Sequence, residues 1–180
     1  MNEKTKNWSI ELVIIGIFLL SGCATIQIMG KSLLQSPPSF IVIGDIAPAN
    51  EKVKIPLEKI EEGRKIIFET FKKELLEFHV FKNIQDLPSE VEDYLLVETK
   101  IGLYREKRPL LATTIVFATA ATSAMEAEMT VTKYKEKATV LKFPGFTMGG
   151  IIYEKSFAYT QGLMVMATRV ARTIKKYDRK

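Results

Sequence analysis

Apolar residues recur along this chain with two spacings, one typical of helices and the other of strands. Between residues 57 and 78 they lie three, four or seven positions apart, which predicts an amphipathic helix that starts near Pro56. Between residues 163 and 177 the same spacing predicts a second helix, whose start after Ser156 the pattern does not define. We expect both helices to bury one apolar face in a common core.

Alternation of apolar and polar residues predicts the strands. Residues 93–104 place Leu95 and Val97 on one face and Glu98 and Lys100 on the other. Residues 125–131 alternate in the same way, and a charged turn at 135–137 separates them from an apolar run at 138–143, so we expect a β-hairpin. Residues 40–43 predict a further, buried strand that Gly44 closes.

Two pairs of turn-forming residues, Pro144-Gly145 and Gly149-Gly150, follow the hairpin. We expect them to break the chain, with Phe143 and Phe146 in an apolar turn. Alternatively, these two phenylalanines are exposed and contact a partner or the membrane.

The order of these elements predicts an α+β fold, a small αβ sandwich in which a mixed or antiparallel sheet is packed by two amphipathic helices. We expect one domain over residues 39–180, a length that buries a proper core. Residues 23–38 show no clear period and contain Pro37-Pro38, which favours a tether before the domain.

The first 22 residues have the parts of a secretory signal peptide. Lys4 and Lys6 precede an apolar core at 12–20, which is too short for a helix that spans a bilayer. Small residues then precede Cys23, the only cysteine of the chain. We therefore expect a signal peptide over residues 1–22.

The sequence Leu20-Ser21-Gly22-Cys23 resembles the lipobox of bacterial lipoprotein precursors. The resemblance implies that Cys23 carries diacylglyceryl and acyl lipid of the palmitate type, which anchors the protein to the cell membrane. Ala24 stands where an aspartate would resemble an inner-membrane retention signal, so the outer membrane is favoured. The alternative is an ordinary secretory signal or an N-terminal membrane anchor with an incidental cysteine.

The chain has a formal net charge of +5, and much of the excess lies at the C-terminus. Arg169, Arg172, Lys175 and Lys176 form a candidate basic surface on the second helix. We interpret this cluster as a solvated helix end whose cations favour the negative pole of the helix dipole. The alternative is a binding surface. Because an exported protein meets little nucleic acid, its partners are then lipid head groups or acidic protein surfaces.

No residue pattern predicts catalysis or metal binding. His79 is the only histidine and Cys23 is assigned to lipid, so we expect no zinc site. No Gly-x-Ser-x-Gly elbow is present, and His79 is interpreted as a partly exposed residue at a helix end. The glutamates of the first helix alternate with lysines and are interpreted as solvent-facing. We therefore expect a non-enzymatic protein without a cofactor other than the covalent lipid.

Residues 109–125 form an uncharged segment between two predicted strands. Three readings stay open: a buried strand or loop, a small-residue surface that packs against another subunit, or a hairpin that enters a membrane when several copies assemble. The last two make the segment a candidate interaction site, with its apolar side chains at Pro109, Leu110, Leu111, Ile115, Val116 and Phe117.

The mature domain resembles small αβ-sandwich envelope lipoproteins, which include accessory lipoproteins and the subunit of the curli secretion pore. The residues that carry this resemblance are Phe40-Ile-Val-Ile-Gly-Asp45 and Asp93-Tyr-Leu-Leu96. It implies a non-enzymatic binding or assembly module that faces the periplasm and has an envelope protein as partner. The alternative is a subunit of an oligomeric outer-membrane export pore or secretion complex, which makes the protein a homo-oligomer.

Overall fold

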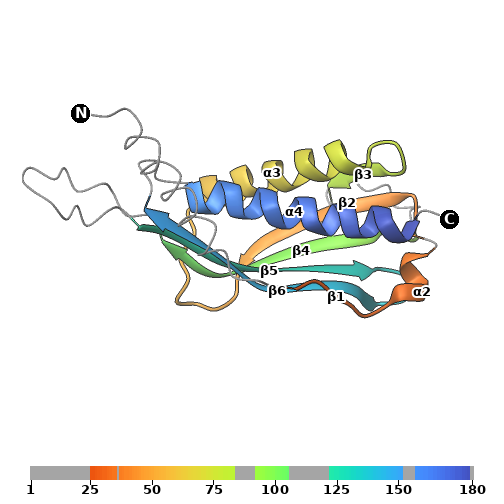
Figure 1. Cartoon of the computed structure of the whole chain (residues 1–180), viewed down its shortest axis with the longest axis horizontal. Coiled ribbons are helices and arrows are strands. Elements are labelled where there is room, and N and C mark those ends of the chain that lie inside the picture. Colours follow the sequence, from red (N-terminus) through yellow and green to blue (C-terminus); the bar gives the residue numbers. More distant parts are fainter. Residues whose placement is uncertain (1–24, 36, 84–91, 106–121, 152–156, 179–180) are drawn as a thin grey trace, which may run out of the picture.

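The computed structural model describes residues 25–35, 37–83, 92–105, 122–151 and 157–178. These residues form two layers, a six-stranded sheet and a pair of long helices that cross one of its faces (Figure 1). The strands are β1 (Gln27–Ile28), β2 (Phe40–Pro48), β3 (Val80–Asn83), β4 (Leu95–Arg105), β5 (Thr122–Lys133) and β6 (Ala138–Ile151). The helices are α2 (Lys31–Leu34), α3 (Leu57–Leu75) and α4 (Phe157–Asp178). The predicted α+β fold is confirmed.

The sheet is mixed, with the strand order β1-β6-β5-β4-β2-β3. β2 runs parallel to both of its neighbours, β3 and β4, whereas the other neighbouring strands are antiparallel. Parallel strands need a long crossover connection, and α3 supplies it between β2 and β3. The predicted hairpin is present as β5 and β6, the two longest strands.

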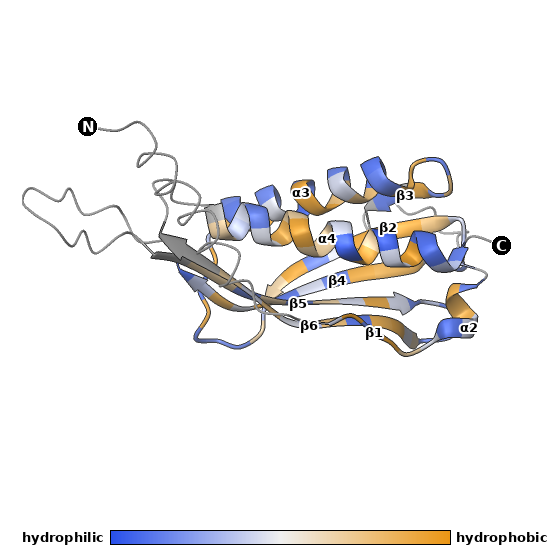
Figure 2. Cartoon of the chain, in the orientation of Figure 1, coloured by the Kyte–Doolittle hydropathy of each residue, from blue (hydrophilic) through white to orange (hydrophobic). Residues whose placement is uncertain are grey.

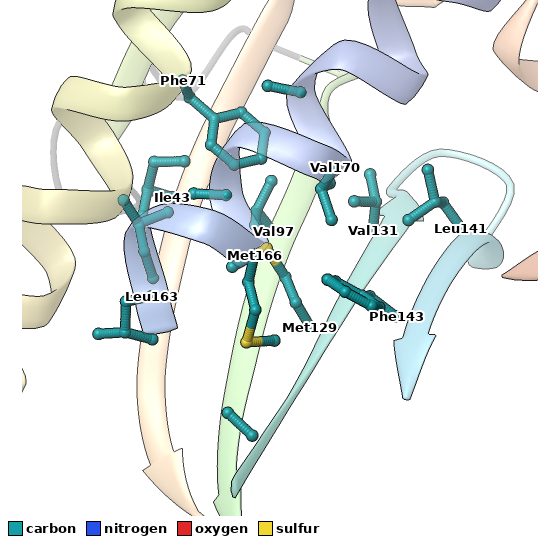
Figure 3. Packing of buried hydrophobic residues seen from close by; sticks show 14 of the residues in the cluster. Ile43, Phe71, Val97, Met129, Val131, Leu141, Phe143, Leu163, Met166 and Val170 are labelled. Carbon is teal, nitrogen blue, oxygen red and sulfur yellow. The ribbon is translucent and has the colours of Figure 1, made fainter. Parts of the chain in front are cut away.

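The core lies between the helix pair and the sheet. α3 buries Gly63, Ile67, Phe71 and Leu75, which are four positions apart and therefore share one face. Figure 3 shows how Phe71 of α3 and Met166 and Val170 of α4 meet side chains of the sheet such as Val97. Figure 2 shows the same division along the helices, with polar residues on their outer side.

Gly63 lets the two helices and the sheet approach each other closely. A Cβ atom at this position would lie 2.6 Å from Cδ1 of Ile46 and 2.9 Å from Cδ1 of Leu163, and it would also meet the hydroxyl of Tyr159. Real Cβ atoms do not make contacts this short, so no larger residue fits here without movement of its neighbours.

The predicted break after the hairpin is wrong, because β6 continues through both turn-forming pairs to Ile151. Phe143 pairs with Met129 and Phe146 with Ala127, so Pro144 and Gly145 together oppose the single residue Glu128. This bulge, with Gly145 at φ +47°, turns both phenylalanines into the core, where they are 0% and 1% exposed. They are therefore not the exposed contact residues of the alternative reading.

Two predicted boundaries also differ from the structure. β2 does not end at Gly44 but continues to Pro48, across a register shift between Ile43 and Ile46. α3 ends at Leu75, so Phe78 lies beyond the helix and is 41% exposed instead of joining its buried face. A strand can pass Gly44 because the backbone hydrogen bonds to β4 continue on both sides of the shift.

Part of the predicted tether belongs to the folded domain. β1 pairs with β6, and the backbone N–H groups of Met29 and Gly30 both donate to the carbonyl of Val140, at 3.0 and 3.1 Å. Leu34 of α2 is fully buried in the core. Residues 25–34 are therefore held by the sheet, and the domain begins before residue 39.

Candidate functional site

Two of the predicted sites lie outside the described residues. These are the lipidation residue Cys23 and the candidate interaction segment from Pro109 to Phe117, and both stay predictions. The end of the uncharged segment is described: Thr122 to Met125 are the first residues of β5, and Met125 is fully buried. The first described residue, Thr25, follows Cys23 by two positions.

The predicted basic surface is divided between two sides of α4. Arg172 and Lys175 face the C-terminal end of α3, whereas Arg169 and Lys176 face the N-terminal segment and β1. Positions 169 and 176 are seven residues apart, close to two full helical turns, so they share a side. The four cations therefore do not act as one patch.

On the α3 side, Arg172 makes a bidentate ion pair with Glu74. Its Nε and Nη2 each donate to a carboxylate oxygen of Glu74 at 3.1 Å. The hydrogen bond from Arg172 lowers the pKa of Glu74 below its ordinary value. Lys175 adds a contact of 3.5 Å from Nζ to the Glu74 carbonyl, and the same Nζ lies 5.3 Å from the ring centre of Phe78. These cations hold α3 against α4, and the interpretation of Glu74 as solvent-facing is not correct.

On the side of α4 that faces away from α3, α4 and the N-terminal segment line an open groove of about 400 Å³. Its walls include Thr25 and Ile28 from the N-terminal segment and Arg169, Thr173, Lys176 and Tyr177 from α4. Arg169 and Lys176 are exposed, and no carboxylate of the described residues lies within ion-pair distance of either. The cations of this side are thus available to an external anion.

One further cation lies beside this groove. Lys31 of α2 is exposed, and its Nζ lies 5.9 Å from the ring centre of Tyr177. Ile28, which lines the groove, is 38% exposed. We call Ile28, Lys31, Arg169 and Lys176 the anchor-side face. Sequence reasoning missed its N-terminal half because residues 23–38 have no period that indicates a folded element.

His79 is buried, at 6% exposure, and the prediction of a partly exposed residue is wrong. Its Nδ1 donates to the carbonyl oxygen of Pro38 at 3.0 Å, and its Nε2 lies 3.4 Å from Oδ2 of Asp178. The imidazole therefore connects the segment before β2 to the last turn of α4.

The sheet face turned away from the helices is polar. Lys142 of β6 pairs with Glu128 of β5 at 3.0 Å, and Lys100 and Glu126 line a hollow of about 190 Å³ beside the bulge at Gly145. Such exposed ion pairs contribute little to stability. The hollow is open to solvent, and the charged residues that line it are Lys100, Glu126 and Glu128.

The described residues contain no group of three or more histidine, cysteine or acidic side chains that could hold a metal ion. Within the same ranges, α3 and α4 are too polar, and α2 too short, for any helix to cross a bilayer.

No protein-family model matches the sequence, and no curated protein sequence matches it. The fold is similar to that of PelC from Paraburkholderia phytofirmans, solved as a dodecamer, at 11% identity over 80% of this chain and 96% of PelC with a TM-score of 0.53. A variant PelC dodecamer matches with a TM-score of 0.54 at 11% identity, over 82% and 98% of the two chains. A lipoprotein from Neisseria meningitidis matches at 7% identity over 77% and 99%, with a TM-score of 0.42. At these identities the PelC structures show a shared fold.

Proposed function

We propose that this protein is a lipid-anchored lipoprotein of the cell envelope, in the outer membrane, whose αβ domain faces the periplasm and works as a non-enzymatic binding or assembly module. The observation that carries the proposal is the sequence Leu20-Ser21-Gly22-Cys23 directly after a short apolar core. Two or more acyl chains on one residue suffice for stable anchoring, whereas one chain binds only marginally.

The folded domain is compatible with this role. It includes β1, which starts at Gln27, four positions after the proposed lipidated residue, so a short stretch of chain connects the two. The features that the described residues offer for recognition are open surfaces, namely the groove beside α4 and the polar face of the sheet. A binding or assembly module needs surfaces of this kind.

Intact mass spectrometry of the full chain, expressed with its own N-terminus and extracted from membranes, tests the proposal. We expect a protomer that begins at Cys23 and carries additional acyl mass. Cys23→Ala should abolish both the added mass and the membrane association, whereas Ser9→Ala, a change before the apolar core, should alter neither. An unmodified protomer, or Cys23→Ala protein that stays bound to the membrane, contradicts the proposal.

A second candidate function is a subunit of an oligomeric outer-membrane export pore or secretion complex. The dodecameric state of the PelC structures, which share the fold, favours it. Native mass spectrometry should then show a closed ring of lipidated protomers, and Val116→Asp should disrupt it. Thr147→Asp, which adds the same charge at an exposed position of β6, serves as the control. A protomer that remains monomeric excludes this second function.

A further inference from the structure

We propose that the anchor-side face docks flat onto an anionic phospholipid surface, so that the domain is held against the membrane in one orientation. The proposal rests on lipidation at Cys23 and adds a recognition surface to it. In this proposal the lipid anchor and the basic side of α4 bind the membrane together.

The first step of the argument is the charge of this face. Lys31, Arg169 and Lys176 are all exposed, and none of them has a carboxylate partner among the described residues. By contrast, Arg172 on the other side of α4 is committed to Glu74. Arg169 lies 5.9 Å from the ring centre of Phe143 and Lys31 lies 5.9 Å from that of Tyr177, contacts that do not neutralise their charges. Such cations attract acidic head groups, because no ion pair has to break first.

The second step is the apolar side chain of the face. Ile28 is 38% exposed and lines the same groove as Arg169 and Lys176. Exposed apolar side chains beside a set of cations are typical of surfaces that lie in the membrane interface. The backbone N–H of the next residue, Met29, donates to the carbonyl of Val140, so Ile28 is presented by a fixed strand end.

The third step is the distance to the anchor, which decides between a membrane and an acidic protein as the occupant. Two residues span at most about 7 Å, so the Cα of Cys23 cannot lie farther than this from that of Thr25. Thr25 itself lines the groove. The screening length at physiological salt is about 8 Å, so an anchor at Cys23 brings this side of the protein within electrostatic range of the bilayer.

The test is a measurement of orientation on the lipidated full chain. Ile28→Cys or Glu69→Cys protein is labelled with a fluorophore and reconstituted into vesicles of phosphatidylcholine, with or without phosphatidylglycerol, that contain spin-labelled lipids as quenchers. Both positions are exposed; Ile28 lines the groove, and Glu69 is on α3, on the opposite side of the helix pair. We expect strong quenching at position 28 and little at position 69, with the contrast greatest in the anionic vesicles.

The charge dependence is tested with a double variant and a matched control. Arg169→Gln with Lys176→Gln removes two cations of the face, and at about fivefold per cation the ratio of docked to undocked domains should fall by roughly 25-fold. Lys65→Gln with Lys72→Gln removes the same charge from exposed positions of α3 and should leave the quenching at position 28 unchanged.

The outcomes separate this inference from the proposed function. Lipidated protein with equal quenching at both positions, or with quenching that ignores phosphatidylglycerol and the double variant, overturns the docking proposal and leaves lipidation intact. Protein that lacks acyl mass before reconstitution overturns the proposed function itself. Release of the quenched probe by a soluble acidic protein, with no effect of the lipid composition, identifies a protein partner and also contradicts membrane docking.

Discussion

The hydroxyl of Tyr159 donates a hydrogen bond of 2.7 Å to the backbone carbonyl of Lys59, 100 residues earlier in the chain. It joins the first turn of α4 to the first turn of α3 in the interior, where Tyr159 is only 2% exposed. The ring also meets Tyr104 of β4 edge-on, at 5.4 Å between centroids. One side chain thus contacts both helices and the sheet and fixes their relative positions.

We expect Tyr159→Phe to lower the free energy of unfolding by about 0.5–1.5 kcal/mol, because the buried carbonyl of Lys59 loses a donor while the ring packing is retained. Urea denaturation followed by circular dichroism measures the change. Tyr177→Phe is the control, since its hydroxyl has no hydrogen bond within the described residues. Equal stabilities of the two variants would contradict a stabilising role for this bond.

Gly63→Ala should be destabilising although alanine is the better helix former. The intrinsic gain in a helix is about 1 kcal/mol. The added methyl would overlap atoms of Ile46, Leu163 and Tyr159, and overpacking typically costs about 1–3 kcal/mol. Gly102→Ala is the matched control, because the nearest atom to its Cβ is 3.6 Å away. A melting temperature of Gly63→Ala at or above that of the unaltered protein would show that the close approach is not required.

The placement of Leu34 in the core predicts that residues 25–34 contribute to folding. Leu34→Ala should lower the free energy of unfolding by about 2–5 kcal/mol, the usual cost of such a cavity. Leu57→Ala, a change of the same size at a side chain that is 73% exposed, should alter it by less than about 0.5 kcal/mol. Similar values for the two variants would mean that residues 25–34 are a tether after all.

The ion pair between Arg172 and Glu74 should make the free energy of unfolding depend on pH. Because Arg172 lowers the pKa of Glu74 in the folded protein below the ordinary value of 4.5, the stabilisation is present above that value and is lost as the pH falls through the lowered one. The difference in free energy of unfolding between the protein and Arg172→Met should therefore shrink on acidification.

Urea titrations from neutral to acidic pH measure this difference. Arg169→Met removes a cation of α4 that has no carboxylate partner among the described residues, and its effect should not follow the same pH dependence. A difference for Arg172→Met that stays constant with pH would refute the assignment.

Tyr94 should ionise at a higher pH than an ordinary tyrosine. Burial raises its pKa from 10.0 to about 12, and the neighbouring Tyr134, stacked at 4.3 Å between ring centroids, adds to the shift. Since the raised pKa belongs to the folded state, its contribution to stability is complete below pH 10 and is lost as the pH rises toward 12.

Ultraviolet absorption during an alkaline titration of folded protein detects the tyrosinate. Tyr94→Phe should remove the component of the titration that ionises at the raised pH. Tyr134→Phe should lower the pKa of Tyr94 only in part, because burial is the larger cause of the raised pKa. A titration of Tyr94→Phe that is identical to that of the parent would contradict the shift.

Much of the fold follows from local patterns that the sequence displays. The period of α3 and α4 and the alternation in β4 and β5 each match the face that the structure buries, because one side of every such element must leave water. The predicted hairpin and the layer of two helices are confirmed for the same reason. What local patterns could not predict is continuation through Gly44 and through Pro144-Gly145, where pairing with neighbouring strands overrides the turn preference of the residues.

Some features of the candidate sites can likewise be predicted from local sequence, whereas others depend on the tertiary structure. The residues that resemble a lipobox are contiguous, so the sequence by itself determines the prediction that Cys23 is lipidated, as it determines the composition of the basic cluster in α4. Only the tertiary structure decided that Arg172 pairs with Glu74 while Arg169 and Lys176 face β1, and that residues 25–34 fold back onto β6. These relations join residues that lie about 100 positions or more apart, and the free energy that selects them arises from packing and charge pairing between elements, which no local pattern of residues contains.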